Sequence, residues 1–385
     1  MRTAVIFAIF LFVSGFTESG TNPAVRTNAP KSEDAYFAYV SLDSEQCIAL
    51  YKIDPSNGSL DLVKKIDAGG TTGSLAVDPS HSILYAAIRS KNSISSFRIN
   101  ARTGDLTPLK TIRAAGNPVY LGTDKSGAFL LTAYFADQRV AVYRIDRDGF
   151  VLDSACVVLV TEPNPHSIQT DPSNQYAFVP CRTGETILQY KLDGATGVLR
   201  PNTPDRTTAT TNTGPRHFTF HSRLNVVYVV NEFASTVTAF KLEQPLGTLT
   251  AFQTLSTLPH DFAGKSTGAD IHLTPDDRFL YASNRGHESI AAFAVDSVSG
   301  SLTPVGQFAT EKTPRSFALD PTGKFMYAGG QGSGKIAAYR IDRHNGALIP
   351  LATYTAGRYP VWILTLRLGL ENSTHNDHSD NTNER

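Results

Sequence analysis

Arginine, histidine and glutamate recur in this sequence at two positions that lie sixteen residues apart. In the segment GPRHFTFHSRLNVVYVVNE the two positions are Arg216 and Glu232, which face each other across a hairpin if the turn centres near Leu224. Shifting both positions by the length of an internal repeat selects equivalent residues: Gly73, Val119, His166, Ala269, Arg315 and Val361 for the first position, and Arg89, Phe135, Arg182, Arg285 and Gln331 for the second.

These thirteen positions are rich in positive charge. Five hold arginine, one histidine and one glutamate, although Asp, Glu, Lys and Arg together make up only 18% of the chain. A ring of like charge costs stability unless an anion neutralises it, so the pattern predicts a site for an anionic ligand. The alternative is that these side chains pair with carboxylates of neighbouring repeats and hold the repeats together. For Arg182 nothing else in the sequence favours binding over such pairing.

Three polar residues adjoin these positions. Asp270 and His272, in GADIHLTP, either line the same site or tie down the loop before it. His217 follows Arg216 directly. Because side chains alternate along a strand, we expect His217 to point away from the site and to pack as a structural histidine.

The elements that must position these residues form a repeat. A turn that ends in glycine and precedes a strand with Leu or Val occurs seven times, at Gly58, Gly104, Gly149, Gly197, Gly247, Gly300 and Gly346. Their separations of 45 to 53 residues define a unit of nearly fifty. Within a unit, a hairpin such as LAVDPSHSILYAAI and an alternating segment such as RVAVYRI add three strands to the one after the glycine.

Seven antiparallel units of four strands predict an all-β fold, a seven-bladed β-propeller over residues 35–369. The first unit lacks an inner strand, whereas VWILTLRL near the C-terminus belongs to no unit. We therefore expect these fragments to complete the first blade together. Two separate β domains would need a linker, and none interrupts the repeat. In a propeller, the two charged positions lie at one rim of the central channel.

The ends of the chain differ from this body. Within residues 1–20, Met1-Arg2 precedes an apolar run from Ala4 to Val13 and then small and polar residues, a layout typical of a secretory signal peptide. The run is too short for a membrane span, which needs ~20 residues. We expect export to the periplasm or the cell exterior; the alternative is a mis-assigned start before a cytoplasmic domain. Residues 21–34 are interpreted as a linker and 370–385 as a disordered polar tail.

Composition excludes several classes of function. Thirty-five basic and 35 acidic residues give no net charge, so nothing favours nucleic acid or, after signal cleavage, a membrane surface. The cysteines Cys47, Cys156 and Cys181 are too few for a disulfide framework or a metal site, and we expect them to pack. The chain has no HExxH, GxxxxGK[ST] or strand-helix GxGxxG motif, and its one GxSxG match, GKSTG at 264–268, has no helix pattern after it as a nucleophile elbow requires. We expect no metal, no cofactor and a monomer.

Four segments carry a resemblance to a known family. GPRHFTFH...YVVNE, GADIHLTPDDRFLYASNR, TPRSFALDPTGKFMYAGGQ and YPVW resemble, in order and spacing, the propeller-type 6-phosphogluconolactonases, relatives of the fungal carboxymuconate lactonising enzymes. The resemblance spans roughly residues 35–369. It implies hydrolysis of a small anionic lactone, 6-phosphogluconolactone, to 6-phosphogluconate in the pentose phosphate pathway.

The resemblance also implies an active site of one histidine, two arginines and one glutamate: His166 in PNPHS, Arg216 in GPRH, Arg285 in SNR and Glu232 in VNE. We expect Glu232 to act as general base on water, Arg216 and Arg285 to stabilise the oxyanion and hold the substrate's anionic group, and His166 to protonate the leaving ring oxygen. Further substrate contacts are expected from Arg89, Arg182, Asp270, His272, Arg315 and Gln331.

Two other functions are compatible with these residues. One is a related lactonase, or a lactone-forming cyclase, for another anionic substrate. The other is an exported propeller without catalytic activity that binds a ligand or a protein at the same rim. Catalysis requires His166 and Glu232 to converge on one small pocket, whereas a binding surface tolerates their separation.

Overall fold

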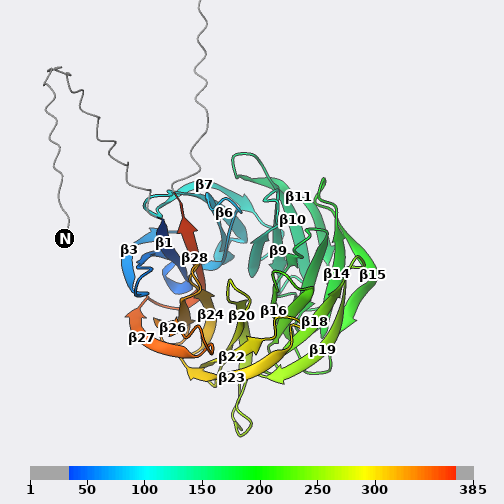
Figure 1. Ribbon diagram of the computed structural model, residues 1–385. Helices are drawn as coiled ribbons and strands as arrows, with labels where there is room; N and C mark the ends of the chain where they lie inside the picture. The colour runs from blue at the N-terminus through cyan, green and yellow to red at the C-terminus, as the bar shows by residue number, and fades with distance from the viewer. Residues whose placement is uncertain (1–33, 370–385) are drawn as a thin grey trace, which may run out of the picture.

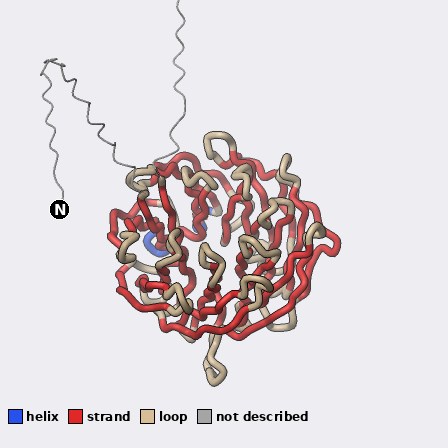
Figure 2. Tube along the Cα trace, in the orientation of Figure 1, coloured by secondary structure: helices blue, strands red, loops and turns tan. Residues whose placement is uncertain are grey.

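Seven antiparallel sheets of four strands surround a central axis in the computed structural model, which describes residues 34–369 (Figure 1). Strands dominate this part of the chain, and two short 3-10 turns, η1 (Asp43–Glu45) and η2 (Arg89–Lys91), interrupt them (Figure 2). The predicted seven-bladed β-propeller is therefore confirmed. The expected signal peptide, nearly all of the expected linker and the polar tail lie outside the described residues.

Each blade begins with a strand at the axis and ends with a strand at the outer surface. In that order, the first four blades consist of β28 (Pro360–Leu368), β1 (Ala35–Leu42), β2 (Cys47–Ile53) and β3 (Leu60–Asp67); β4 (Thr72–Val77), β5 (Ile83–Ile88), β6 (Ser93–Ile99) and β7 (Leu106–Arg113); β8 (Tyr120–Thr123), β9 (Phe129–Tyr134), β10 (Arg139–Ile145) and β11 (Val151–Val160); and β12 (Gln169–Thr170), β13 (Tyr176–Cys181), β14 (Thr186–Leu192) and β15 (Leu199–Thr208). The last three consist of β16 (Pro215–Phe220), β17 (Val226–Asn231), β18 (Thr236–Glu243) and β19 (Thr248–Ser256); β20 (Thr267–Leu273), β21 (Phe279–Arg285), β22 (Ser289–Val295) and β23 (Leu302–Ala309); and β24 (Pro314–Leu319), β25 (Phe325–Gly330), β26 (Lys335–Ile341) and β27 (Leu348–Thr355).

The ring is closed by the C-terminal strand. β28 pairs antiparallel with β1, from Ala35 opposite Leu368 to Val40 opposite Ile363, so the two ends of the propeller share one sheet. The red strand β28 lies beside the blue strand β1 in Figure 1. This arrangement is the shared first blade that the unmatched segment VWILTLRL predicted.

Apolar side chains fill the spaces between adjacent blades, in seven buried clusters that each join two neighbouring sheets. The repeat glycine permits this close approach. Gly58 has φ of +77°, and a Cβ there would lie 2.4 Å from the Phe325 ring of the last blade. The Gly58 carbonyl accepts a hydrogen bond of 3.0 Å from the Tyr327 hydroxyl. The recurring glycine is therefore a contact between blades as well as a turn residue.

A β-bulge recurs near the start of the innermost strands. The pairing of β16 with β17 shifts between Pro215 and His217, and that of β24 with β25 shifts between Pro314 and Ser316. Arg216 and Arg315 are the extra residues. Related shifts occur in β4, β20 and the pairing of β28 with β1. Because a bulge interrupts the regular alternation of side chains, it can turn two consecutive side chains toward the axis.

We predict that β28, the strand that closes the ring, is essential for folding. Deleting residues 358–385 removes β28, uncovers β1 and exposes the apolar side chains that β28 packs, so the protein should aggregate or melt at a temperature lower by more than about 10 °C. Deleting only 371–385 leaves every pairing of β28 in place and is the matched control. Thermal denaturation of both truncations is the measurement, and equal stability would contradict a structural role for the shared blade.

Candidate active site

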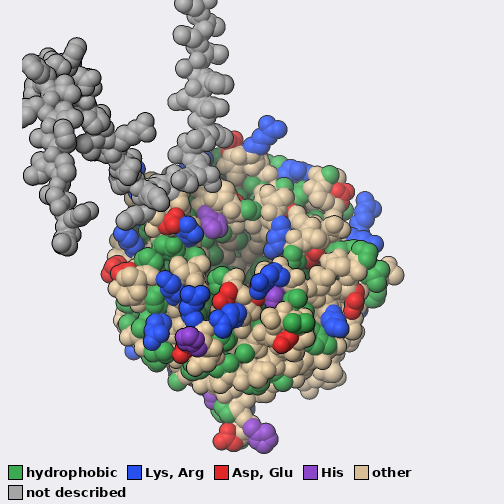
Figure 3. Space-filling view, in the orientation of Figure 1, with side chains coloured by type: hydrophobic (Ala, Val, Ile, Leu, Met, Phe, Trp, Pro, Cys, Tyr) green, Lys and Arg blue, Asp and Glu red, His purple; other side chains and the backbone are tan. Residues whose placement is uncertain are grey.

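The rim pocket lies on the axis, where the innermost strands begin. Its walls are Gly73, Ser74, Arg89, Val119, His166, Arg216, His217, Arg315, Val361 and Trp362. Six of these residues occupy the first of the two repeat positions that the sequence selected; only Ala269 of that set is missing. Lys and Arg side chains gather beside the hollow near the centre of this face (Figure 3). Residues distant in sequence thus converge as the spacing predicted.

Glu232 pairs with three arginines next to the pocket. Its Oε1 lies 2.7 Å from Arg182 Nη1 and 3.1 Å from Arg285 Nη2, and its Oε2 lies 3.0 Å from Arg216 Nε. Burial raises the pKa of Glu232, but Arg216, Arg285 and Arg182 outweigh it, so the net pKa is lowered. These pairs join three consecutive blades, as the alternative interpretation of the charged ring anticipated for part of the ring.

Arg216 is the most deeply buried member of this array. Its side chain is 1% exposed, and its Nη1 donates a hydrogen bond to the Ala269 carbonyl. Burial, Arg285 and Arg315 all lower the pKa of Arg216, and Glu232 and Asp270 only partly offset these effects. The single Glu232 carboxylate therefore pairs with three guanidinium groups, and the site retains an excess of positive charge.

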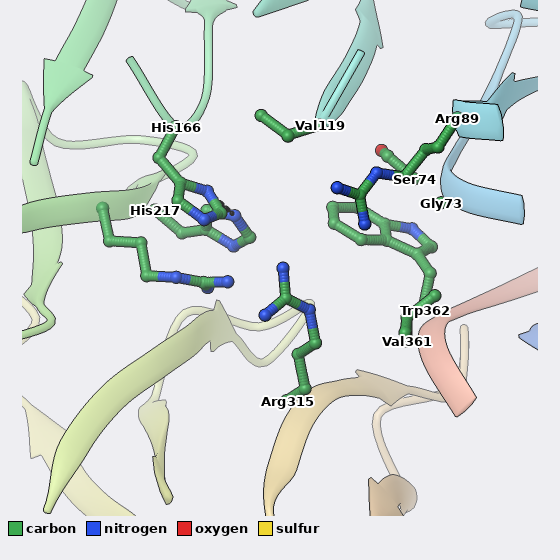
Figure 4. Close-up of a pocket in the computed structure, with 10 residues that line it drawn as sticks. Gly73, Ser74, Arg89, Val119, His166, His217, Arg315, Val361 and Trp362 are labelled. Atoms are coloured by element: carbon green, nitrogen blue, oxygen red, sulfur yellow. Dashed lines mark hydrogen bonds between the residues drawn. The ribbon is translucent and has the colours of Figure 1, made fainter. Parts of the chain in front are cut away.

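Arg89 and Arg315 extend into the pocket (Figure 4). Among the described residues, no acidic side chain lies within ion-pair distance of either, although Arg89 Nε donates a hydrogen bond of 3.2 Å to Asn117 Oδ1. Burial lowers the pKa of Arg315 to about 10, with Arg285 and Arg89 adding to the effect. A bound anion would relieve this repulsion, and the planar fork of arginine suits a phosphate or a carboxylate.

A second network lies beside the arginines. His166 Nδ1 is 3.2 Å from His217 Nε2, and His217 Nδ1 is 2.9 Å from Asp270 Oδ1 (Figure 4 draws the first contact). Burial and Arg216 lower the pKa of His217 to about 4. Burial and Arg216 also lower the pKa of His166 well below its usual value. Both imidazoles are therefore neutral near pH 7.

The expectation that His217 packs away from the site is wrong. The bulge at Arg216 disrupts the alternation on which that expectation relied, so the side chains of both residues line the pocket. Trp362 enters in the same way, since the shift between β28 and β1 falls at Val361. The rings of His217 and Trp362 pack edge to face, with centroids 5.8 Å apart. No repeated charge marks these residues in the sequence, although His217 lies in GPRH and Trp362 in YPVW, two of the segments that carry the family resemblance.

The remaining expected site residues occupy different places. Asp270 and His272 line a neighbouring cavity, which shares Trp362 with the rim pocket. Arg182 stacks over the Phe135 ring, 4.6 Å from its centroid, while it pairs with Glu232. Gln331 follows β25, and its backbone N–H bonds to Thr313; it lines neither of these two cavities.

Two further structural findings concern the described part of the chain. Residues 34–369 contain no group of three or more His, Cys, Asp or Glu side chains arranged to hold a metal ion. In the same residues, no helix has the length and apolar character that crossing a membrane requires. Cys47 and Cys181 are buried free thiols, and Cys156 is a half-buried one, consistent with the expected packing role.

The family model described as "Lactonase, 7-bladed beta-propeller" matches residues 34–365. The chain belongs to this family. Among curated relatives, a 6-phosphogluconolactonase of Serratia proteamaculans is 40% identical over 147 residues, which are 38% of this chain and 44% of that protein. Another, from Pectobacterium carotovorum, is 38% identical over 146 residues, with the same shares of the two chains. The chain thus spans less than half the length of these relatives.

Solved structures extend the likeness over the whole propeller. The periplasmic gluconolactonase of Pseudomonas aeruginosa has a TM-score of 0.81 and 24% identity, over 87% of this chain and 99% of the other. A protein from Lactobacillus plantarum has a TM-score of 0.79 and 24% identity, over 87% of this chain and 100% of the other. At this identity the structures establish the shared fold.

We predict that this lactonase-family propeller loses stability as the pH falls from about 6.5 to about 4. In that range the unfolded chain protonates His217 at its ordinary pKa of 6.5, whereas the folded protein, with a His217 pKa of about 4, does not. The unfolded state therefore binds more protons, and stability is fully retained only above pH 6.5. The lowered pKa of His166 acts in the same direction.

Thermal denaturation at several pH values tests this prediction. His217→Phe preserves the ring but removes its titration, so the loss of melting temperature between neutral and mildly acidic pH should shrink in the variant. An equal loss in both proteins would assign the pH dependence to other groups.

Proposed function

We propose that the rim pocket hydrolyses a lactone that carries an anionic group, with 6-phosphogluconolactone as the best candidate. The main support is the pair of arginines, Arg89 and Arg315, that reach into the pocket without a carboxylate partner among the described residues, next to the neutral His166. The name of the curated relatives suggests the specific substrate.

Each charged group has a distinct proposed role. Arg89 and Arg315 bind the phosphate, because they are accessible from the pocket and no carboxylate of the described residues lies within ion-pair distance of either. Arg216 faces the lactone carbonyl and stabilises the oxyanion that forms when water attacks. Arg285 and Arg182 hold Glu232, which in turn orients Arg216.

The base that activates water has two candidates. Glu232 is the base expected from the sequence, but three arginines occupy its two carboxylate oxygens, and Glu232 is not among the residues that line the pocket. We assign the base to His166, because His166 lines the pocket and is neutral, with a nitrogen lone pair available to accept a proton. Glu232 then serves as the counter-charge that organises the arginines.

The chemistry balances with these groups alone. His166 takes a proton from water while the water oxygen bonds to the lactone carbonyl carbon, and the carbonyl oxygen becomes an oxyanion beside Arg216. The intermediate collapses, the ring C–O bond breaks, and the protonated His166 returns its proton to the leaving ring oxygen. The second role agrees with the acid function expected for His166 from the sequence.

We further propose that the protein acts after export, as the composition of residues 1–20 suggests. One structural neighbour is described as periplasmic. The alternative, which the family resemblance implies, is the cytoplasm. A monomeric state stays a prediction. The place of action bears on which lactone is the substrate. A phosphorylated sugar lactone arises where sugars are phosphorylated, so an exported enzyme meets it only if that lactone is also present outside the cytoplasm.

A hydrolysis assay tests the proposed function. We predict that freshly prepared 6-phosphogluconolactone is opened faster than gluconolactone, by at least about tenfold in kcat/KM, because two charge-assisted arginine contacts are lost with the phosphate. Rates are corrected for spontaneous opening. Equal rates would remove the phosphate from the specificity, and no catalysis of either lactone would favour the binding propeller.

The variant Arg315→Gln separates binding of the anion from catalysis. It should lower kcat/KM for the phosphorylated lactone and leave the rate for gluconolactone nearly unchanged. Inorganic phosphate should raise the melting temperature of the wild type, and less so that of the variant. Arg340→Gln is the matched control, because Arg340 is exposed on β26, away from the pocket.

The variant Glu232→Gln decides between its two candidate roles. As an organising counter-charge, Glu232 should prove mainly structural: the variant loses stability on the order of 3 kcal/mol and some activity, but keeps the shape of the pH–rate profile. As the base, Glu232 would instead be needed for nearly all turnover while stability stayed the same. Glu162→Gln, which removes an exposed carboxylate paired with Arg206, is the control for charge alone.

A further inference from the structure

A line of hydrogen-bonding side chains leads from the rim pocket into the protein. It runs from His166 through His217 to Asp270, with contacts of 3.2 and 2.9 Å. The three residues are 6%, 4% and 3% exposed. They come from three consecutive blades, so the line crosses two blade interfaces. Neither the sequence pattern nor the family resemblance assigns a role to His217.

Asp270 is held as a carboxylate by contacts on both oxygens. Its Oδ1 accepts from the Ile271 N–H at 3.1 Å as well as from His217, and its Oδ2 accepts from the Phe317 N–H at 3.3 Å. His272 Nε2 lies 3.3 Å from the same Oδ2. Burial alone would raise the pKa of Asp270, but His272 and His217 hold the pKa well below its usual value.

These contacts determine which nitrogen of each histidine carries the proton. A carboxylate only accepts, so His217 must donate from Nδ1 to Asp270. A neutral imidazole has one N–H, so Nε2 of His217 accepts, and His166 must donate from Nδ1. The remaining nitrogen of His166, Nε2, is then unprotonated. Within residues 34–369 it has no hydrogen-bond partner, and His166 lines the pocket.

We propose that Asp270 and His217 are positioning residues that hold His166 in the tautomer whose Nε2 accepts the proton of the attacking water. This inference rests on the proposed lactone hydrolysis. When His166 becomes an imidazolium, its Nδ1–H points to His217 and through it to the buried carboxylate. The proton leaves again to the ring oxygen, so neither His217 nor Asp270 changes its number of protons over the cycle.

The surrounding charges make such a partner necessary. Arg216 and Arg315, together with burial and His217, disfavour a positive charge on His166 and lower its pKa. Asp270 supplies the negative charge at the far end of the line. Its effect reaches His166 only through the polarised ring of His217, which is a reason for His217 to be an imidazole rather than an apolar residue.

Aromatic side chains pack against both imidazoles of the line and fix their orientation. The His217 ring contacts Tyr120 and Trp362 edge to face, with centroid distances of 5.7 and 5.8 Å. The Phe135 ring packs similarly against His166, at 5.6 Å. These rings come from other blades and restrict rotation of both imidazoles, which a general base needs in order to present one nitrogen to the substrate.

The tautomers can be measured directly, without any substrate. Nitrogen-15 NMR of histidine-labelled wild-type protein near pH 7 should show His166 and His217 both neutral, each with its proton on Nδ1. Assignment uses the variants His166→Gln and His217→Phe. A proton on Nε2 of His166 would overturn the inference, whatever the enzyme's activity.

Kinetics of three variants give the second test. Asp270→Asn cannot accept hydrogen bonds on both of its former oxygens, so it should lower kcat on the order of 100-fold, with KM nearly unchanged. His217→Phe keeps the ring packing and should lose a similar factor. The double variant should lose no more than either single one, because the residues act as a unit. Ser283→Ala is the control: its hydroxyl accepts from the backbone N–H of Asp270 and contacts neither the Asp270 carboxylate nor the two imidazoles.

The outcomes separate this inference from the proposed function. A wild-type protein that opens lactones, together with folded Asp270→Asn and His217→Phe variants that retain full kcat, would overturn the positioning role alone. A wild-type protein that opens neither lactone would overturn the proposed function and, with it, the positioning role. If Asp270→Asn fails to fold, His217→Phe and the NMR result decide.

Discussion

Repulsion among arginines at the propeller axis is the constraint on which the rest of the site depends. The ring brings the first side chains of its inner strands together. Burial, Arg285 and Arg315 lower the pKa of Arg216, and burial, Arg285 and Arg89 lower the pKa of Arg315. Glu232 neutralises part of this charge from one side. The rest is available to a substrate anion, so the same repulsion that costs stability favours binding.

Burial and the same arginines keep the two histidines neutral. Burial disfavours a charged imidazole and Arg216 adds to this effect, so His166 and His217 are unprotonated and can act only through their lone pairs and single N–H groups. The buried carboxylate of Asp270 then fixes which nitrogen of each histidine carries the proton. Two charge systems therefore share the pocket: an arginine array around Glu232, and a neutral imidazole line that ends at Asp270.

The sequence predicted the architecture and the positions around the axis because both follow from a period. The repeat arithmetic selected seven residues that line the pocket, among them His166, Arg216 and Arg315. It did not select His217 or Trp362, which directly follow selected positions, and the alternation of side chains along a strand argued against such neighbours until the bulges cancelled it. It also could not distinguish Arg216 with its carboxylate partner from Arg315 without one in the described chain, since pairing depends on distances between blades.

Closure by the final strand has a consequence for when the site comes into existence. β28 seals the first blade and also brings Val361 and Trp362 to the pocket wall. While the chain is being synthesised, six blades can assemble, but residues 360–368 emerge from the ribosome after all of them. A nascent chain therefore has an open ring and an incomplete pocket. If the protein is exported, its pocket is complete only once residues 360–368 have also crossed the membrane.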